Sequence, residues 1–150
     1  MRIVNSVLGD ASGGRWQVVC DYSRLLSAQG HRVLMLVGRR HLPDTTRLPP
    51  GVKLEVIDNR GHYDLVAAWR LRRRLLGFDP QLAIAHCSRS VALLKRALGG
   101  RAPLLAVSHS HKIRRLLPAD ACVALNQSIR ARFASAANGK PCFVIPNRIQ

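Results

Sequence analysis

Short apolar runs alternate along the chain with longer segments in which apolar residues recur at helical spacing. The runs are nearly continuous in Val, Ile, Leu and Ala, a pattern typical of parallel strands that are covered on both faces. They predict strands at Arg2–Leu8, His31–Val37, Val52–Ile57, Gln81–His86, Pro103–Ser108, Ala121–Leu125 and Cys142–Ile145. The amphipathic segments predict helices at Arg15–Gln29, Tyr63–Leu76, Ser88–Leu98 and Gln127–Ala137, with a short helical or irregular piece at Lys112–Leu117.

Strands that alternate with helices at this spacing predict right-handed crossovers and one fold class. That class is α/β, a doubly wound, parallel, Rossmann-like sheet between two layers of helices. The 150 residues fit a single domain and contain no internal repeat. Gly30 suits the C-cap of the first helix, and Asn126 suits the N-cap of the last.

The helix predicted at Tyr63–Leu76 has a face that the pattern leaves ambiguous. The apolar residues that can share one side at helical spacing are Leu65, Ala68, Trp69, Leu75 and Leu76. Arg72 falls in the same stripe. Either its aliphatic stem carries the charge out to water, or the helix has a different register.

The chain is strongly basic, with 24 Lys and Arg against 8 Asp and Glu and a net charge of +16. The densest cluster is Arg70, Arg72, Arg73 and Arg74. Such a balance favours a polyanion, an anionic membrane surface or an acidic substrate. Aromatic residues make up only 5%, too few for a base-stacking platform, so nucleic acid is not the expected partner.

The apolar segments exclude some classes of protein. None approaches the roughly 20 residues of a membrane-spanning helix, and Asn5 and Ser6 interrupt the N-terminal run, which therefore does not resemble a signal peptide. The cysteines, at positions 20, 87, 122 and 142, have no paired spacing. Reduced core thiols in a cytoplasmic protein are the expectation, rather than a zinc site.

The carboxyl ends of the predicted strands are rich in glycine, histidine and serine, and ligands of doubly wound sheets bind at that edge. His86 and His109 each end a strand, so they should meet there, with Ser88 and His111 close by. An imidazole can accept a proton from a hydroxyl or bind a sugar or phosphate oxygen, although a purely structural role is the alternative. A zinc site formed by His86, His109 and His111 is the other alternative, but these histidines have no neighbouring carboxylate ligand, so no metal is expected.

The first predicted loop, Gly9–Gly14, places Gly13 and Gly14 directly before a helix. Bare backbone N–H groups and the positive end of a helix dipole suit a phosphate group. The spacing is that of neither a dinucleotide fingerprint nor a Walker A loop, so no nicotinamide or flavin cofactor is expected. A turn that only needs the backbone freedom of glycine is the alternative.

Several short motifs follow one another in a recognisable order: the Gly13-Gly14 loop, Gly30-His31-Arg32-Val33, Pro80-Gln81-Leu82-Ala83-Ile84-Ala85-His86, Val107-Ser108-His109, the strand from Ala119-Asp120 to Leu125, and Val144-Ile145-Pro146-Asn147-Arg148-Ile149-Gln150. Together they resemble the N-terminal half of a GT-B glycosyltransferase of glycosyltransferase family 4, a large retaining group. The chain departs from the family pattern where Gln81 and Ile84 replace Asp and His, and where Arg148 and Gln150 replace Gly and Asp.

The resemblance implies a role for each matching residue. Gly13 and Gly14 would approach the diphosphate of a nucleotide-sugar donor, His109 would be the catalytic residue beside the transferring sugar, and His86 would line the acceptor side. Ser88 and His111 are assigned to the acceptor side because they lie near these histidines. No metal and no cofactor beyond the nucleotide sugar are expected.

The resemblance also implies a wider setting. Residues 1–150 would form one acceptor-side domain, without the second domain that binds most of the donor, and would be inactive alone. The acceptor would be a glycan or a lipid-linked glycan of the cell envelope, reached at the inner membrane face. The alternatives are a non-catalytic basic module that binds an anionic membrane or nucleic acid, and a flavodoxin-like domain with structural histidines.

Overall fold

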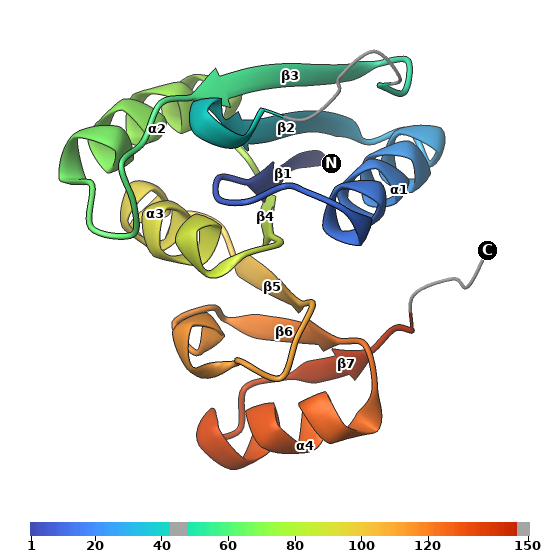
Figure 1. The fold of residues 1–150 in the computed structure, drawn as a ribbon. Coiled ribbons are helices and arrows are strands. Elements are labelled where there is room, and N and C mark those ends of the chain that lie inside the picture. The colour runs from blue at the N-terminus through green and yellow to red at the C-terminus, as the bar shows by residue number, and fades with distance from the viewer. Residues whose placement is uncertain (43–47, 147–150) are drawn as a thin grey trace.

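The computed structural model describes residues 1–42 and 48–146, which form a parallel sheet between helical layers (Figure 1). The strands are β1 (Arg2–Val7), β2 (Arg32–Gly38), β3 (Val52–Ile57), β4 (Leu82–Ala85), β5 (Leu104–Ser108), β6 (Ala121–Ala124) and β7 (Cys142–Val144). Their order is β3-β2-β1-β4-β5-β6-β7, and every pairing is parallel. The predicted fold class is therefore confirmed.

The helices lie where the periodicity predicts them, within two residues at each end. They are α1 (Gly14–Ala28), α2 (Leu65–Phe78), α3 (Ser88–Leu98) and α4 (Gln127–Ala136), with 3₁₀ turns η1 (Arg39–His41) and η2 (Arg114–Leu116). Figure 1 shows α1 on one face of the sheet and α2 and α3 on the other. Among the described residues, no helix combines the length and the hydropathy that a bilayer-spanning segment requires.

Alternation along the strands decides which side chain meets which helix. In β1, Val4 packs into the core beneath α2 and α3, whereas Val7 packs with Val19 beneath α1. Asn5 shares the α1 side with Val7, and its amide reaches the α1 backbone at Val19. A polar residue in the middle of an apolar strand is thus fully buried under a helix.

The predicted face of α2 is wrong for three of its five residues. Leu65, Trp69 and Leu76 are 66%, 56% and 52% exposed. The buried residues are Ala67, Ala68, Leu71 and Leu75. The Asp64 carboxylate accepts a hydrogen bond from the Ala67 N–H and so sets where the helix begins, and the small alanines let α2 pack closely on α3. Because Leu71 is fully buried, three residues of the predicted face are exposed and Arg72 is exposed with them, the second of the two interpretations of the helix, a different register, is the correct one.

The turn residues behave largely as predicted. The Asn126 side chain caps α4 by accepting a hydrogen bond from the Ile129 N–H at 2.9 Å. Gln29, not Gly30, is the C-cap of α1, and Gly30 follows it with a φ of +85°. All four cysteines are free thiols, three of them buried. The predicted motif at Asn147–Gln150 lies outside the described residues.

Candidate functional site

Three neighbouring strands, β1, β4 and β5, end at the same edge of the sheet, which we call the carboxyl rim. The loops that leave them carry Gly13, His86 and His109. The two imidazoles meet there, with His86 Nδ1 3.2 Å from His109 Nε2 and ring centroids 5.5 Å apart. The prediction that adjacent strand ends bring these histidines together is confirmed.

His86 lies beneath the surface, with only 1% of the residue exposed. Its Nε2 is 2.7 Å from Asn5 Oδ1, and the Asn5 amide nitrogen donates to the Val19 carbonyl at 2.9 Å and to Ser23 Oγ at 2.8 Å. The Tyr22 ring meets the imidazole edge-on at a centroid distance of 5.0 Å. Contacts with Asn5, Tyr22 and His109 hold the ring in place, so His86 lies beneath His109 and supports it. Contact between His86 and an acceptor stays a prediction.

Both imidazoles are neutral at neutral pH. Burial lowers the pKa of His109 to about 4, and the nearby positive charge of Arg15 contributes to that lowering. Burial also lowers the pKa of His86 well below its usual range, helped by His109 and Arg15. His109 is half-buried, so it keeps part of its surface at the rim. A neutral imidazole there can both donate and accept hydrogen bonds.

We expect the protein to lose stability as the pH falls from 6.5 to about 4. In this window the unfolded chain binds protons at positions 86 and 109 that the folded chain does not, so the free energy of unfolding decreases on acidification. His109 alone should contribute about 2 kcal/mol, allowing for its partial exposure. Urea unfolding across the window measures the slope.

A matched pair of variants shows which residues cause the pH dependence of the unfolding free energy. The double variant His86→Gln/His109→Gln should remove most of it, whereas His111→Gln, at an exposed position, should leave it unchanged. The pKa of His62 is also lowered by burial, so this imidazole accounts for part of the slope that remains in the double variant. The pKa values of Asp64 and Asp120 are lowered by backbone hydrogen bonds, and these carboxylates add to the slope only toward the acid end of the window, where their unfolded forms begin to bind protons. An unaltered slope in the double variant would remove the imidazoles as its cause.

The glycine loop lies at the same rim. Gly13 is the N-cap of α1 with a φ of +65°, and Gly14 begins the helix. A side chain at either position would meet nothing within 4 Å, so the backbone is open to an approaching group. Arg15 follows directly; it donates to the Asp10 carbonyl at 2.8 Å, and its charge lowers the pKa of both imidazoles. The loop and the histidines therefore share one electropositive rim.

Two predicted acceptor residues are not joined to the imidazole pair. Ser88 Oγ lies 2.8 Å from His62 Nε2, on the loop that follows β3. The pKa of His62 is lowered by burial and by Arg115 and Arg89. His111 is exposed, and its backbone carbonyl accepts a hydrogen bond from Arg132 at 3.2 Å. Their contact with an acceptor stays a prediction.

Three rim residues were not predicted from the sequence: Asn5, Arg15 and His62. Asn5 carried a usable signal, because a buried polar residue inside an apolar strand needs hydrogen-bond partners. Arg15 is one of 20 arginines, and its place directly after Gly13 and Gly14 was the signal that could have found it. Among the described residues, no group of three or more His, Cys, Asp or Glu side chains is placed to hold a metal ion.

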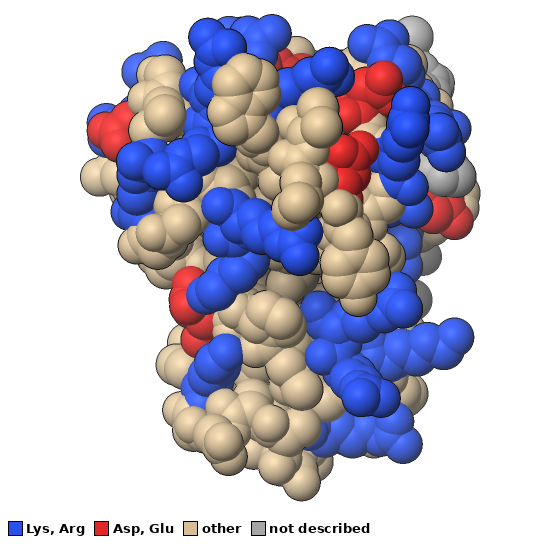
Figure 2. All heavy atoms as spheres, turned by 90° about the vertical axis from the view of Figure 1, so that its left-hand side faces the viewer, with Lys and Arg blue, Asp and Glu red and all other residues tan. Residues whose placement is uncertain are grey.

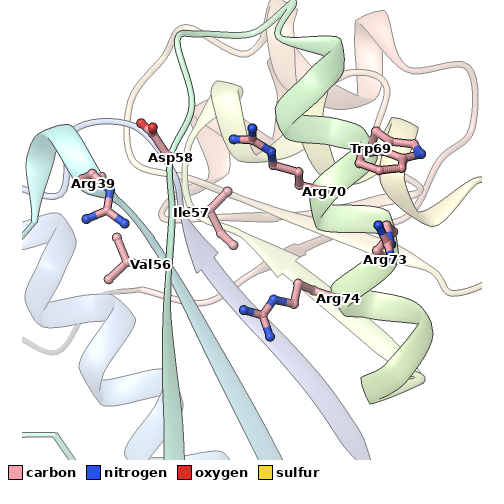
Figure 3. Close-up of a pocket in the computed structure, with 8 residues that line it drawn as sticks. All are labelled: Arg39, Val56, Ile57, Asp58, Trp69, Arg70, Arg73 and Arg74. Atoms are coloured by element: carbon pink, nitrogen blue, oxygen red, sulfur yellow. The ribbon is translucent and has the colours of Figure 1, made fainter.

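A second feature lies away from the imidazoles, at the β3 edge of the sheet. A groove of about 620 Å³ separates β3 from α2, and we call it the arginine groove (Figure 3). Its lining consists of Arg39, Val56, Ile57, Asp58, Trp69, Arg70, Arg73 and Arg74. Arg70 and Arg74 extend from α2 toward β3, and the Arg73 guanidinium lies 5.0 Å from the centre of the Trp69 ring.

The solvent-exposed side of α2 is both apolar and basic, and we call it the α2 outer face. It contains the exposed residues Leu65, Val66, Trp69, Arg70, Arg72, Arg73 and Leu76. Figure 2 shows this side of the molecule, where basic side chains surround neutral ones and acidic side chains are few. The predicted arginine cluster thus lies beside a stripe of exposed apolar residues. Three of these, Leu65, Trp69 and Leu76, had been predicted to lie in the core.

Solved structures with the same fold include glycosyltransferases. Sucrose-phosphate synthase from Thermosynechococcus elongatus superposes with a TM-score of 0.79 at 13% identity, over 99% of this chain and 48% of that one. The lipopolysaccharide outer core galactosyltransferase WaaB gives 0.72 at 11%, over 100% and 46%. Anabaena HepE, solved with UDP, gives 0.71 at 15%, over 100% and 45%. The chain therefore spans about half the length of these proteins.

The sequence itself was compared with protein families and with curated proteins. No curated protein matches it. The family model of Glycosyltransferase Family 4 matches residues 12–150, nearly the whole chain. That match includes Gly13, Gly14 and both strand-end histidines, and it agrees with a fold that forms one half of the GT-B architecture. The chain accordingly belongs to Glycosyltransferase Family 4.

Proposed function

We propose that this domain binds the acceptor in an enzyme that transfers a sugar from a nucleotide-sugar donor to a glycan or lipid-linked glycan. The observation that carries the proposal is the shared rim, where the open Gly13-Gly14 backbone, the Arg15 charge and the half-buried His109 lie together. Backbone N–H groups at a helix N-terminus suit the donor diphosphate, and a neutral imidazole suits a sugar hydroxyl.

The proposed reaction requires that the two substrates be oriented and that the charge of the departing diphosphate be stabilised, more than it requires a strong base from the protein. In the retaining reaction that we propose, the bond between the sugar and the diphosphate breaks, and the acceptor oxygen bonds to the same sugar carbon. The acceptor proton passes to the departing diphosphate. The rim then holds the diphosphate and aligns the sugar, contributions that are large when the groups are held in place.

The relatives support the remaining parts of the proposal. HepE was solved with UDP and with UDP and glucose, and WaaB is a galactosyltransferase of the lipopolysaccharide outer core. We propose a nucleotide sugar as the donor and an envelope glycan as the acceptor class. Because this chain spans about half of such proteins, we also propose that a donor-binding half is needed for turnover.

The test is a transfer assay with the protein complete with its donor-binding half. It is offered UDP-, GDP- and ADP-sugars in turn, with a membrane-glycan extract as acceptor. We expect release of the nucleoside diphosphate from one donor only when the acceptor is present. If no nucleotide sugar supports acceptor-dependent release, the proposed function is wrong. Release without the acceptor would indicate a hydrolase instead.

We further propose that the domain docks on an anionic membrane through the α2 outer face. Exposed apolar stripes beside basic residues fit the boundary between lipid headgroups and acyl chains, and tryptophan favours that depth. Each arginine near an anionic leaflet adds about 1 kcal/mol of attraction. The arginine groove beside the stripe then offers guanidinium groups to headgroup phosphates. A non-catalytic basic module would show the same docking but no transfer.

Vesicle binding tests the docking. The chain has two tryptophans, so Trp16→Phe leaves Trp69 as the sole tryptophan fluorophore. We expect its emission to shift to shorter wavelength with phosphatidylglycerol vesicles and not with pure phosphatidylcholine, and the shift to weaken with salt. Arg70→Gln/Arg73→Gln should weaken binding roughly 30-fold. Arg24→Gln/Arg130→Gln, on α1 and α4, is the matched control, and an equal loss there would refute the α2 outer face.

A further inference from the structure

We infer that Asn5 is a positioning residue that acts through His86 to fix the proton of His109 on Nε2, which leaves Nδ1 of His109 as a hydrogen-bond acceptor at the carboxyl rim. Three consecutive hydrogen bonds connect the Val19 carbonyl, Asn5, His86 and His109. The donor and acceptor of the first bond determine those of the second, and the second determines those of the third. The use of His109 Nδ1 in sugar transfer rests on the proposed function. The position of the proton on His109 does not depend on that function.

The first bond is oriented by the α1 backbone. A carbonyl oxygen can only accept, so the Asn5 group that lies 2.9 Å from the Val19 carbonyl is the amide nitrogen. The second N–H of that amide is directed at Ser23 Oγ, at 2.8 Å. The amide oxygen is therefore the atom that faces His86 Nε2 at 2.7 Å, and an oxygen there must accept. The proton of His86 lies on Nε2.

The direction of the bond between His86 and His109 follows from the neutrality of His86. The ring is buried, its hydrogen-bond partners among the described residues are an amide and another imidazole, and the groups whose charge acts on it, His109 and Arg15, are both basic. A buried imidazolium in that setting would be unpaired and costly. With its single proton on Nε2, His86 presents a bare Nδ1 to His109 Nε2 at 3.2 Å. His109 must donate, so its own proton is on Nε2.

The third step identifies the free atom. His109 is neutral for the same reasons of burial and proximity to Arg15, so its Nδ1 carries a lone pair and no proton. Within residues 1–42 and 48–146, the His109 ring has no hydrogen bond besides the one to His86. The residue is half-buried at the rim that holds the glycine loop. A hydroxyl of the bound sugar or acceptor is the donor that this atom would recognise.

The tautomer can be measured in this chain without any enzymatic assay. Long-range proton–nitrogen correlation spectra of the imidazole-labelled protein at pH 7.5 distinguish a protonated ring nitrogen from a bare one. We expect both His86 and His109 to be protonated on Nε2 and bare on Nδ1. A proton on Nδ1 of His109, or rapid averaging between its two nitrogens, would overturn the inference.

A variant tests whether Asn5 sets the arrangement. In Asn5→Asp, a carboxylate faces His86 and stabilises its imidazolium, which then donates from Nδ1 to His109. We expect the proton of His109 to move to Nδ1. Asn126→Asp makes the same chemical change at the α4 cap, where Asp is equally suitable, and should leave both imidazoles as in the wild type.

The outcomes separate the inference from the proposed function. An unchanged His109 in a folded Asn5→Asp protein would show that Asn5 does not govern the proton. The wild-type spectrum decides the tautomer even if this variant does not fold, as circular dichroism will show. If the tautomers are as inferred but no sugar is transferred, the proposed function fails alone. If transfer occurs while His109 carries its proton on Nδ1, the inference fails alone.

Discussion

Replacing Gly38 with alanine is expected to destabilise the protein by roughly 3 kcal/mol. Gly38 ends β2 with an ordinary φ of −81°, so the cost does not come from backbone strain. An added Cβ would overlap the carbonyl oxygen of Leu8 and lie 3.1 Å from its carbonyl carbon. Because these are backbone atoms of the chain that leaves β1, no side chain can turn away to relieve the clash.

The displaced segment leads into the site. The Leu8 carbonyl accepts a hydrogen bond from Asn59 Nδ2 at 3.2 Å, and Asn59 Oδ1 accepts one from Arg89 at 3.3 Å. A shift of Leu8 therefore disturbs the loops after β1 and β3 together with the start of α3. We expect the glycine loop to lose its position relative to His109 even in molecules that remain folded.

Urea unfolding of a matched pair measures the effect. Gly77→Ala is the control, because a Cβ there meets nothing within 4 Å and the residue lies inside α2. It should stabilise the protein by about 0.5–1 kcal/mol. The two alanine variants thus have opposite expected signs, while the urea dependence of the unfolding free energy should stay the same. Destabilisation of similar size in both would contradict the close approach at Gly38.

The sheet could be predicted because strands that are buried on both faces require short runs of apolar residues, and such runs can be recognised in the sequence. A parallel strand covered on both faces must be apolar at nearly every position, as Val33–Val37 are in β2. A run of five such residues bounded by polar residues and glycine is too short for a core helix and favours a strand. The strand-end rule then brought His86 and His109 to one rim, since β4 and β5 are neighbours.

The face of α2 could not be predicted because apolar residues occur around its whole circumference. Leu65, Trp69 and Leu76 compete with Leu71 and Leu75 for the core at helical spacing. Packing against α3 determines which face of α2 is buried, because the small Ala67 and Ala68 allow a close contact there. This helix–helix contact cannot be recognised from the sequence of α2 alone. The arginine groove was missed for the same reason, since it joins Arg39 after β2 to a helix whose orientation was misassigned.

The hydrogen-bonded support of His109 was also hidden. It joins residues 5, 19, 23, 86 and 109, which lie far apart in the sequence. Strand alternation could have placed Asn5 on the face of Val7, but the helix that covers that face cannot be identified from the strand alone. The two histidines were therefore predictable as neighbours, whereas their different depths, one buried and one at the rim, were not.

Replacing His109 with alanine is expected to lower kcat for sugar transfer by roughly 100-fold, the lower end of what a positioned acid–base or hydrogen-bonding group contributes. The imidazole is the half-buried partner of a neutral pair, and its Nδ1 is available at the rim. Its removal leaves His86 Nδ1 without a donor but keeps the Asn5 bond, so the fold should survive. The loss should fall on kcat more than on KM for the donor, because the glycine loop is untouched.

The comparison of His109→Ala with His111→Ala tests the central claim most directly. Both variants remove an imidazole from the same loop, but His111 is exposed and its backbone carbonyl, not its ring, accepts the hydrogen bond from Arg132. Acceptor-dependent release of nucleoside diphosphate is measured for both variants in a protein that includes the proposed donor-binding half. We predict a roughly 100-fold lower kcat for His109→Ala and little change for His111→Ala. Equal rates for the two variants would contradict a sugar-transfer site built around His109.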